Sequence, residues 1–261
     1  MMKTYPAPRG PSIVPPAGPD TTLPLPRILC LHGGGSNARV FRMQCRVIIA
    51  HLRPYFRLVF AEGPWESPSG PDIDLVYGDW GPFKSWWRPA AGQPFGAAYE
   101  LRDSLEAFQG AVGDALDEDD KLGGTGEYVG VLGFSQGANA AASVLLQQQN
   151  HNLFGTANGQ ATAQKVNYRF AVLMAGRGPP VDLRVGVPAE AKLALMTVHV
   201  HGVLDPGLER HRELLEEWCE GGTTRLVEWE GDHRLPFKND DVRVLVAEIL
   251  DVARETGALK E

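Results

Sequence analysis

Residues 127–149 read EYVGVLGFSQGANAAASVLLQQQ, and this stretch decides the fold. The apolar run at 128–132 is typical of a buried strand, and the small and helix-favouring residues at 138–149 are typical of a helix. Between them lies Gly133-Phe134-Ser135-Gln136-Gly137, a G-x-S-x-G motif. A strand, this motif and a helix, in that order, predict a nucleophile elbow that exposes the serine at the carboxyl end of the strand.

The two glycines of the motif have a steric explanation. The turn of an elbow is so tight that the residues two before and two after the serine approach neighbouring backbone, where a β-carbon would clash. The serine takes a strained backbone conformation beneath the positive end of the following helix. An ordinary glycine-rich turn is the competing interpretation, but the strand before the motif and the helix after it favour the elbow.

Composition limits the class of protein. The chain has 261 residues, of which 43% are hydrophobic, and this suits one large α/β domain. A net charge of −7 argues against nucleic acid and against an anionic membrane as partners. The three cysteines are unclustered, so neither a disulfide framework nor a metal site is expected, and no cofactor is indicated. Without a secretory signal or an apolar run of about 20 residues, the expected compartment is the cytosol.

The order of the predicted elements indicates a parallel sheet. Eight prolines mark residues 1–26 as an N-terminal extension, and residues 27–261 form the predicted domain. Within it, a strand at 27–32 is followed by an amphipathic helix, on which Cys45 is expected in the core, and by a strand at 56–61. A strand–helix–strand unit of this kind is typical of α/β proteins with parallel strands.

The loop HGGGSN at 32–37 follows the first strand. In enzymes with a serine elbow, this loop supplies one backbone donor of the oxyanion hole, and the residue after the nucleophile supplies the other. We therefore expect the amides of Gly34 and Gln136 in these roles, with His32 ordering the loop. A phosphate-binding loop is the alternative, but neither G-x-G-x-x-G nor a Walker pattern is present.

Residues 62–97, the lid segment, interrupt the alternation of strands and helices. They hold six prolines and show no evident secondary structure. A long loop after the carboxyl end of a strand is typical of a lid or binding loop, and its aromatic residues can line an apolar pocket. The candidates for substrate contact are Trp80, Phe83, Trp86 and Trp87. The alternative is that the tryptophans only fix the segment onto the core.

Two later residues complete a candidate triad. Asp205 follows a predicted strand at 195–201, and His233 follows the next one at 224–229. With Ser135, they give the chain order Ser, Asp, His of the α/β-hydrolases. Serine needs a base to become a nucleophile, histidine can act as that base near neutral pH, and a buried carboxylate fixes the imidazole tautomer.

Other residues compete for these roles. Asp182 is an alternative carboxylate near the end of an earlier strand, and Asp232 is a weaker one because it adjoins His233. His199 and His201 alternate on a strand and are interpreted as structural. No role is assigned to His151, in a polar loop predicted at 150–167, or to His211, on a predicted helix at 208–220.

The sequence resembles the fungal family of serine hydrolases, which are small α/β-hydrolases related to carboxylesterases. The resemblance covers roughly residues 27–255. Its motifs are RILCLHGGGSNARVFRMQ at 27–44, LVFAEGP at 58–64, GVLGFSQGA at 130–138, HVHGVLDP at 199–206 and GDH at 231–233. One departure is HGGGSN itself, because an aromatic residue often follows the first HG in this family.

The resemblance implies a function as well as a fold. The nucleophile, acid and base positions of the family match Ser135, Asp205 and His233, and the implied fold is a single domain with a mostly parallel sheet, helices on both faces and an aromatic lid insertion. Some members are thioesterases that release polyketides from their synthases, as in the lovastatin pathway. We therefore expect a thioesterase acting on an acyl carrier protein. A small-ester carboxylesterase, an acyltransferase and a non-catalytic acyl-binding module are the alternatives.

Overall fold

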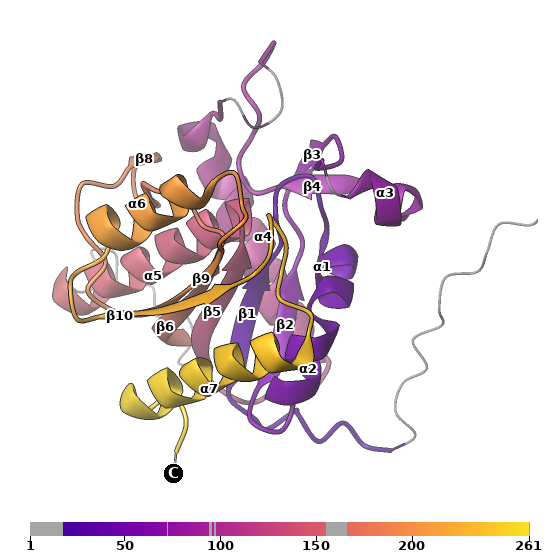
Figure 1. The fold of residues 1–261 in the computed structure, drawn as a ribbon, viewed down its shortest axis with the longest axis vertical. Coiled ribbons are helices and arrows are strands. Elements are labelled where there is room, and N and C mark those ends of the chain that lie inside the picture. Colours follow the sequence, from indigo (N-terminus) through magenta and orange to yellow (C-terminus); the bar gives the residue numbers. More distant parts are fainter. Residues whose placement is uncertain (1–17, 72, 94–95, 97, 155–165, 261) are drawn as a thin grey trace, which may run out of the picture.

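A six-stranded parallel sheet forms the centre of the protein, with strand order β10-β9-β6-β5-β1-β2 (Figure 1). The computed structural model describes residues 18–260 apart from 72, 94–95, 97 and 155–165. The strands of this sheet are β1 (Arg27–Leu31), β2 (Arg57–Ala61), β5 (Tyr128–Phe134), β6 (Val166–Met174), β9 (Met196–Gly202) and β10 (Thr224–Trp229). None of the helices in the described residues is both long and apolar enough to cross a membrane.

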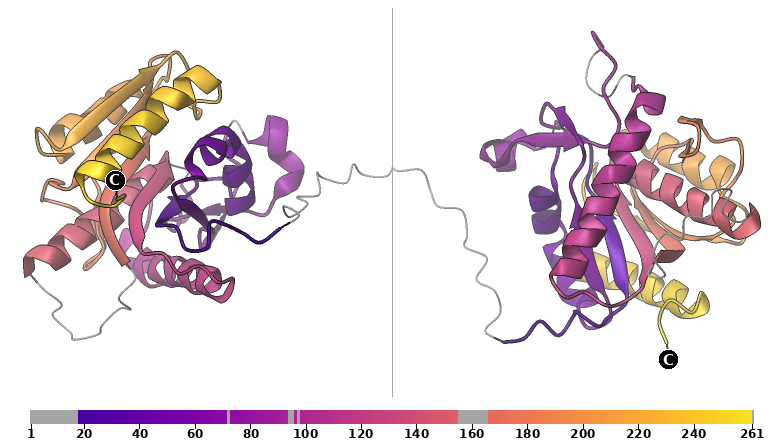
Figure 2. Two further views of the ribbon diagram at one scale, coloured as in Figure 1. Left: turned by 90° about the horizontal axis from the view of Figure 1, so that it is seen from below. Right: turned by 180° about the vertical axis from the view of Figure 1, so that it is seen from behind.

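Helices cover both faces of this sheet (Figure 2). On one face, α1 (Ala38–Gln44), α2 (Arg46–Leu52) and α7 (Asn239–Glu255) contribute side chains to one core cluster. The other cluster receives side chains from α4 (Leu101–Lys121), α5 (Gln136–Phe154) and α6 (Leu208–Trp218). Strand β1 shows the division, because Ile28 and Cys30 belong to the first cluster, whereas Leu29 and Leu31 belong to the second. The predicted fold class, a single α/β domain covered on both faces, is confirmed.

Outside the lid segment, three parts of the described secondary structure differ from the prediction. The helix predicted before β2 consists of two helices, α1 and α2, which are separated at Cys45; as predicted, this residue is buried in the core. The polar loop predicted at 150–167 overlaps α5, which continues to Phe154, and β6, which begins at Val166; its residues 155–165 lie outside the described part of the chain. Between the strands β6 and β9, the structure adds a small hairpin of β7 (Val181–Asp182) and β8 (Val187–Pro188).

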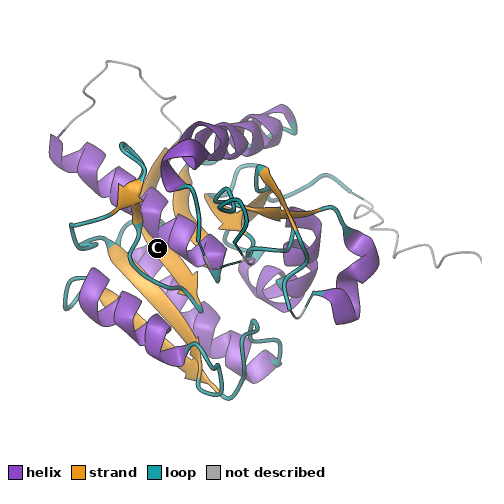
Figure 3. Cartoon of the chain, turned by 90° about the horizontal axis from the view of Figure 1, so that it is seen from above, coloured by secondary structure: helices purple, strands orange, loops and turns teal. Residues whose placement is uncertain are grey.

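The lid segment is structured, which corrects the expectation that residues 62–97 form a loop without secondary structure. It contains β3 (Trp65–Ser67), α3 (Asp74–Tyr77), a 3₁₀ helix η1 (Gly78–Trp80) and β4 (Phe83–Ser85). Strands β3 and β4 pair antiparallel, and β4 is tied to the glycine loop because the Gly35 amide donates to the Lys84 carbonyl at 2.9 Å. The lid segment therefore lies above the carboxyl ends of β1 and β2 (Figures 1 and 3). Elements of three or four residues are too short to produce a recognisable hydrophobic period.

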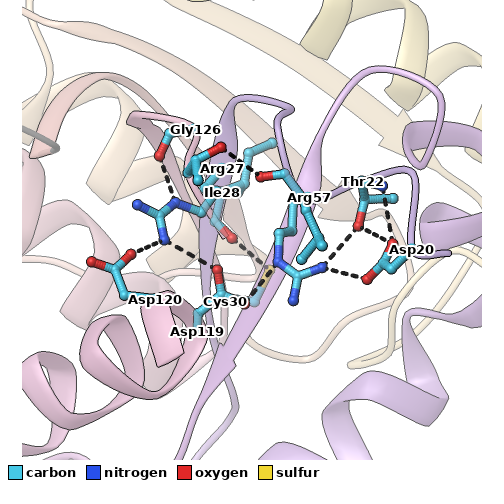
Figure 4. Close-up of polar contacts among 11 residues, drawn as sticks. Asp20, Thr22, Arg27, Ile28, Cys30, Arg57, Asp119, Asp120 and Gly126 are labelled. Atoms are coloured by element: carbon cyan, nitrogen blue, oxygen red, sulfur yellow. Dashed lines mark hydrogen bonds and ion pairs between the residues drawn. The ribbon is translucent and has the colours of Figure 1, made fainter. Parts of the chain in front are cut away.

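A charged cluster fixes residues 18–26 to the opposite end of the sheet (Figure 4). Arg57 on β2 donates to Asp20 at 2.7 Å and to Asp119 at 2.8 Å. The fully buried Arg27 on β1 donates to the same Asp119 at 3.1 Å. One carboxylate thus bridges the first two strands, and the end of the predicted N-terminal extension is held beside them.

Candidate active site

Ser135 occupies the turn between β5 and α5. Its φ angle is 53°, in the left-handed region that residues with a β-carbon rarely adopt. A β-carbon on Gly133 would lie 2.1 Å from the carbonyl oxygen of Gly137, and one on Gly137 would lie 2.1 Å from that of Leu31. Both distances are far below van der Waals contact, so the close approach predicted on either side of the serine is confirmed.

The structure brings Ser135, His233 and Asp205 into one hydrogen-bonded chain. The Ser135 hydroxyl lies 3.0 Å from Nε2 of His233, and Nδ1 of the same ring lies 2.7 Å from Oδ2 of Asp205. The three residues follow β5, β10 and β9, whose carboxyl ends meet at one edge of the parallel sheet. In this arrangement His233 can accept the hydroxyl proton while Asp205 fixes the orientation of the ring.

Asp205 is held as a buried carboxylate. Its Oδ1 accepts a hydrogen bond of 2.7 Å from the backbone N–H of Gly207, just before α6 begins at Leu208. Burial acts to raise the pKa of Asp205, but the hydrogen bonds from Gly207 and His233 outweigh burial and lower this pKa. The carboxylate is therefore ionised at neutral pH.

The two alternative carboxylates have other partners. Asp182 forms an ion pair of 2.6 Å with Arg184, and Asp232 lies 3.3 Å from Arg234. The hydrogen bond from Arg184 is the main reason that the pKa of Asp182 is lowered. These contacts favour Asp205 as the partner of His233.

The glycine loop is ordered by His32, as expected. Nδ1 of this ring donates to the carbonyl of Gly33 at 2.8 Å, and Nε2 accepts from the amide of Gly63 at 2.9 Å. Gly34 lies beside the residue that follows the serine, because a β-carbon on Gly34 would be 3.2 Å from the Gln136 side chain. Gln136 is the first residue of α5, where a backbone N–H has no acceptor within the helix. The amides of Gly34 and Gln136 thus stay our candidates for the oxyanion hole.

The Gln136 side chain connects the elbow to the lid segment. Its Oε1 accepts hydrogen bonds from the Ser85 hydroxyl at 3.0 Å and from the Trp86 amide at 2.8 Å. The Trp86 indole N–H in turn donates to the His32 carbonyl at 2.7 Å. The lid segment is therefore bonded to both loops that carry the candidate oxyanion donors. The spacing of residues along the sequence contains no signal for these contacts.

The aromatic residues predicted to contact substrate divide into two pairs. Trp86 and Trp87 are only 0% and 2% exposed, and both pack on Phe108 of α4, with ring centroids 5.8 and 4.9 Å away. This placement favours the alternative, in which the two tryptophans fix the lid segment to the core. Trp80 and Phe83 are half-buried and stay candidates for substrate contact.

A row of buried histidines lies behind the candidate triad. His199, His201 and His211 are all buried. Burial lowers the pKa of His199 to about 3, and it lowers the pKa values of His201 and His211 to about 4. For His199 the structural role expected from the sequence agrees with its contact of 3.1 Å to the Thr197 hydroxyl. The position of His211 beside Asp205 was not predicted.

We expect this row of histidines to make the fold acid-sensitive. Unfolded histidine titrates near 6.5, whereas the three buried rings resist protonation until pH 4 or below. The unfolded chain therefore binds more protons in this window. The free energy of unfolding should fall as the pH decreases, with a slope that approaches about 1.4 kcal/mol per pH unit for each ring below about pH 6. Urea denaturation at pH 7, 6 and 5 measures how the free energy of unfolding depends on pH. His199→Gln should make this dependence weaker. A free energy of unfolding that is constant from pH 7 to pH 5 would contradict the expectation.

Only one set of side chains in the described residues could hold a metal ion. Ligand atoms of Asp205, His211 and His233 lie within 4.8 Å of one another. However, Nδ1 of His233 and Oδ2 of Asp205 are already paired with each other at 2.7 Å. We therefore interpret this set as the hydrogen-bonded Asp205–His233 pair with the His211 imidazole beside it.

The parallel sheet with a serine in a strand–turn–helix elbow defines an α/β-hydrolase. Residues 22–245 match the family described as Serine hydrolase (FSH1), and the chain belongs to this family. The resemblance predicted from the sequence is thereby confirmed, and the protein is a serine hydrolase.

Individual relatives agree with this membership. Esterase pigG of Monascus ruber is 49% identical and aligns over 92% of this chain and 96% of the relative. Probable esterase azaC of Aspergillus niger is 51% identical, with 92% and 90% covered. Esterase dbaE of Emericella nidulans is 44% identical, with 92% and 95% covered.

Solved structures with low sequence identity share the fold. A carboxylesterase from Mesorhizobium loti superimposes with a TM-score of 0.53 at 18% identity, covering 86% of this chain and 88% of the other. The Bacillus cereus carboxylesterase gives a TM-score of 0.53 at 17% identity, with 89% and 91% covered.

Proposed function

We propose that the protein cleaves acyl thioesters or esters through an acyl-enzyme on Ser135. The hydrogen-bonded chain of Ser135, His233 and Asp205, with distances of 3.0 and 2.7 Å, carries this proposal. His233 takes the hydroxyl proton as the serine attacks the carbonyl carbon, and it returns the proton to the leaving group. Water then attacks the acyl-enzyme by the same route. The amides of Gly34 and Gln136 face the negative charge that develops on the carbonyl oxygen.

We further propose that the preferred substrate is a thioester on the acyl carrier protein of a polyketide synthase, in the cytosol. Support comes from the resemblance to a family in which some members release polyketides. A thiolate also leaves more easily than an alkoxide, and so needs less protonation by His233. A carboxylesterase acting on small esters is the second candidate, and it is favoured by the relatives that are named esterases.

One acyl group presented in three ways distinguishes the two candidates. We expect kcat/KM to be highest for the carrier-bound thioester, roughly tenfold above a pantetheine thioester, because contacts with the carrier contribute binding energy remote from the reacting carbonyl. A simple alkyl ester should be cleaved more slowly than either. The measurement is product release by mass spectrometry, with Ser135→Ala as the control for spontaneous thioester hydrolysis. Equal kcat/KM for the alkyl ester and the carrier-bound form would establish the carboxylesterase alternative.

A further inference from the structure

His211 lies in the first turns of α6 and is completely buried, with 0% of its surface exposed. Neither of its ring nitrogens has a hydrogen-bond partner within the described part of the chain. Burying polar atoms without partners costs stability, so an apolar side chain would fill this space at a lower cost. Packing alone therefore gives no reason for an imidazole at this position.

The neighbours of His211 suggest such a reason. Its Nδ1 lies 3.8 Å from Oδ2 of Asp205, the same oxygen that accepts the hydrogen bond from His233. The ring centroid of His211 is 5.9 Å from that of His233. His211 is thus adjacent to both members of the Asp–His pair.

Four ionisable groups face the His211 ring from the elements packed around it. They are Asp205 after β9, His233 after β10, His201 on β9 and Arg177 after β6. The crowding is visible at Gly207, where a β-carbon would lie within 3.2 Å of Arg177, Asp205 and His211. Burial keeps the His211 ring neutral at neutral pH by lowering its pKa to about 4, although Asp205 acts in the opposite direction. A neutral ring can carry its one proton on Nδ1, toward the carboxylate.

We propose that His211 is a positioning residue, whose Nδ1–H holds the Asp205 carboxylate and thereby sets the orientation of His233. The inference rests on the proposed function, because it concerns the same triad. At 3.8 Å the contact is longer than a hydrogen bond, so the Nδ1–H acts on the carboxylate through its dipole. The positive end of this dipole partly neutralises the negative charge of the carboxylate. Without it, Asp205 attracts the His233 proton more strongly.

Three substitutions test which ring nitrogen of His211 positions Asp205. His211→Asn places an amide nitrogen near the position of Nδ1, His211→Gln places one near Nε2, and His211→Leu removes both. We expect His211→Leu and His211→Gln to lower kcat roughly tenfold with little change in KM. Both variants should also shift the acid limb of the pH profile of kcat to higher pH by about half a pH unit. The kcat of His211→Asn should stay within about twofold of that of the unmodified protein. His199→Gln, at a buried histidine outside the triad, controls for loss of stability.

Two results would overturn the proposal. One is an unchanged kcat and acid limb in His211→Leu. The other is a loss of activity that equals the fraction of unfolded protein in every variant, His199→Gln included. That result would show that the substitutions act only on stability.

A second measurement does not depend on turnover. The imidazole signal of His233 is titrated by NMR in Ser135→Ala, with and without His211→Leu. We expect the midpoint to rise by about half a pH unit when His211 is replaced, and an unchanged midpoint overturns the proposal. If Ser135→Ala kept its activity, the proposed function would fail, but this titration would still report on the contact between His211 and Asp205.

Discussion

Ser135→Ala is expected to lower kcat by up to about 10⁶-fold, by analogy with other serine triads. The Ser135 hydroxyl is the atom that His233 contacts at 3.0 Å, and alanine leaves that base with no proton to accept. The substitution should also abolish covalent labelling by a fluorophosphonate, because the probe reacts with an activated serine. Turnover of an acyl thioester and the intact mass of the labelled protein measure the two effects.

The fold should survive this substitution. Alanine keeps the β-carbon, so the backbone strain at a φ of 53° is unchanged, and the thermal midpoint should stay close to that of the unmodified protein. Ser67→Ala is a matched control, because Ser67 lies on β3 and its hydroxyl donates to the adjacent Pro68 carbonyl. It should keep both turnover and labelling. A fluorophosphonate adduct that persists in Ser135→Ala would place the nucleophile elsewhere.

The elbow was predictable from the sequence because its physical requirements are local. A buried strand, two glycines at fixed distances from a serine and a helix all occur within residues 128–149. The glycine requirement follows from contacts with the neighbouring backbone of Leu31 and Gly137. Asp205 and His233 were predictable for a related reason, since parallel strands bring their carboxyl ends to one edge of the sheet.

The lid segment shows what sequence patterns do not contain. Its elements of three or four residues are held by contacts with distant residues, such as the hydrogen bond from the Gly35 amide to the Lys84 carbonyl on β4. The aromatic residues therefore gave no indication of which of them turn inward. Trp86 and Trp87 proved to be buried, whereas Trp80 is half-buried.

His211 is a second case of this kind. Its position six residues after Asp205, on a predicted helix, was visible in the sequence. The helix alone did not indicate a role, because the relevant neighbours come from three different strand ends. Only the arrangement of those loops in space places a buried imidazole beside the carboxylate.

Asp205→Asn is expected to lower kcat by about 10⁴-fold while the fold stays intact, by analogy with the same substitution in another serine triad. The asparagine oxygen can still accept the backbone hydrogen bond that Gly207 donates to Oδ1 at 2.7 Å. However, the amide nitrogen can now donate to Nδ1 of His233, which moves the ring proton to Nε2. That nitrogen then faces the Ser135 hydroxyl with a proton instead of a lone pair, and it cannot act as a base.

The competing carboxylates supply the controls for this prediction. Asp182→Asn should break only the ion pair with Arg184 of 2.6 Å, and Asp232→Asn only the contact with Arg234 of 3.3 Å, so both variants should keep their kcat. Fluorophosphonate labelling of Asp205→Asn should become slow but still modify Ser135, because the nucleophile is present and only its activation is lost. If Asp182→Asn lost the activity and Asp205→Asn kept it, then Asp182 would be the acid of the triad, and the positioning role proposed for His211 would have no carboxylate to act on.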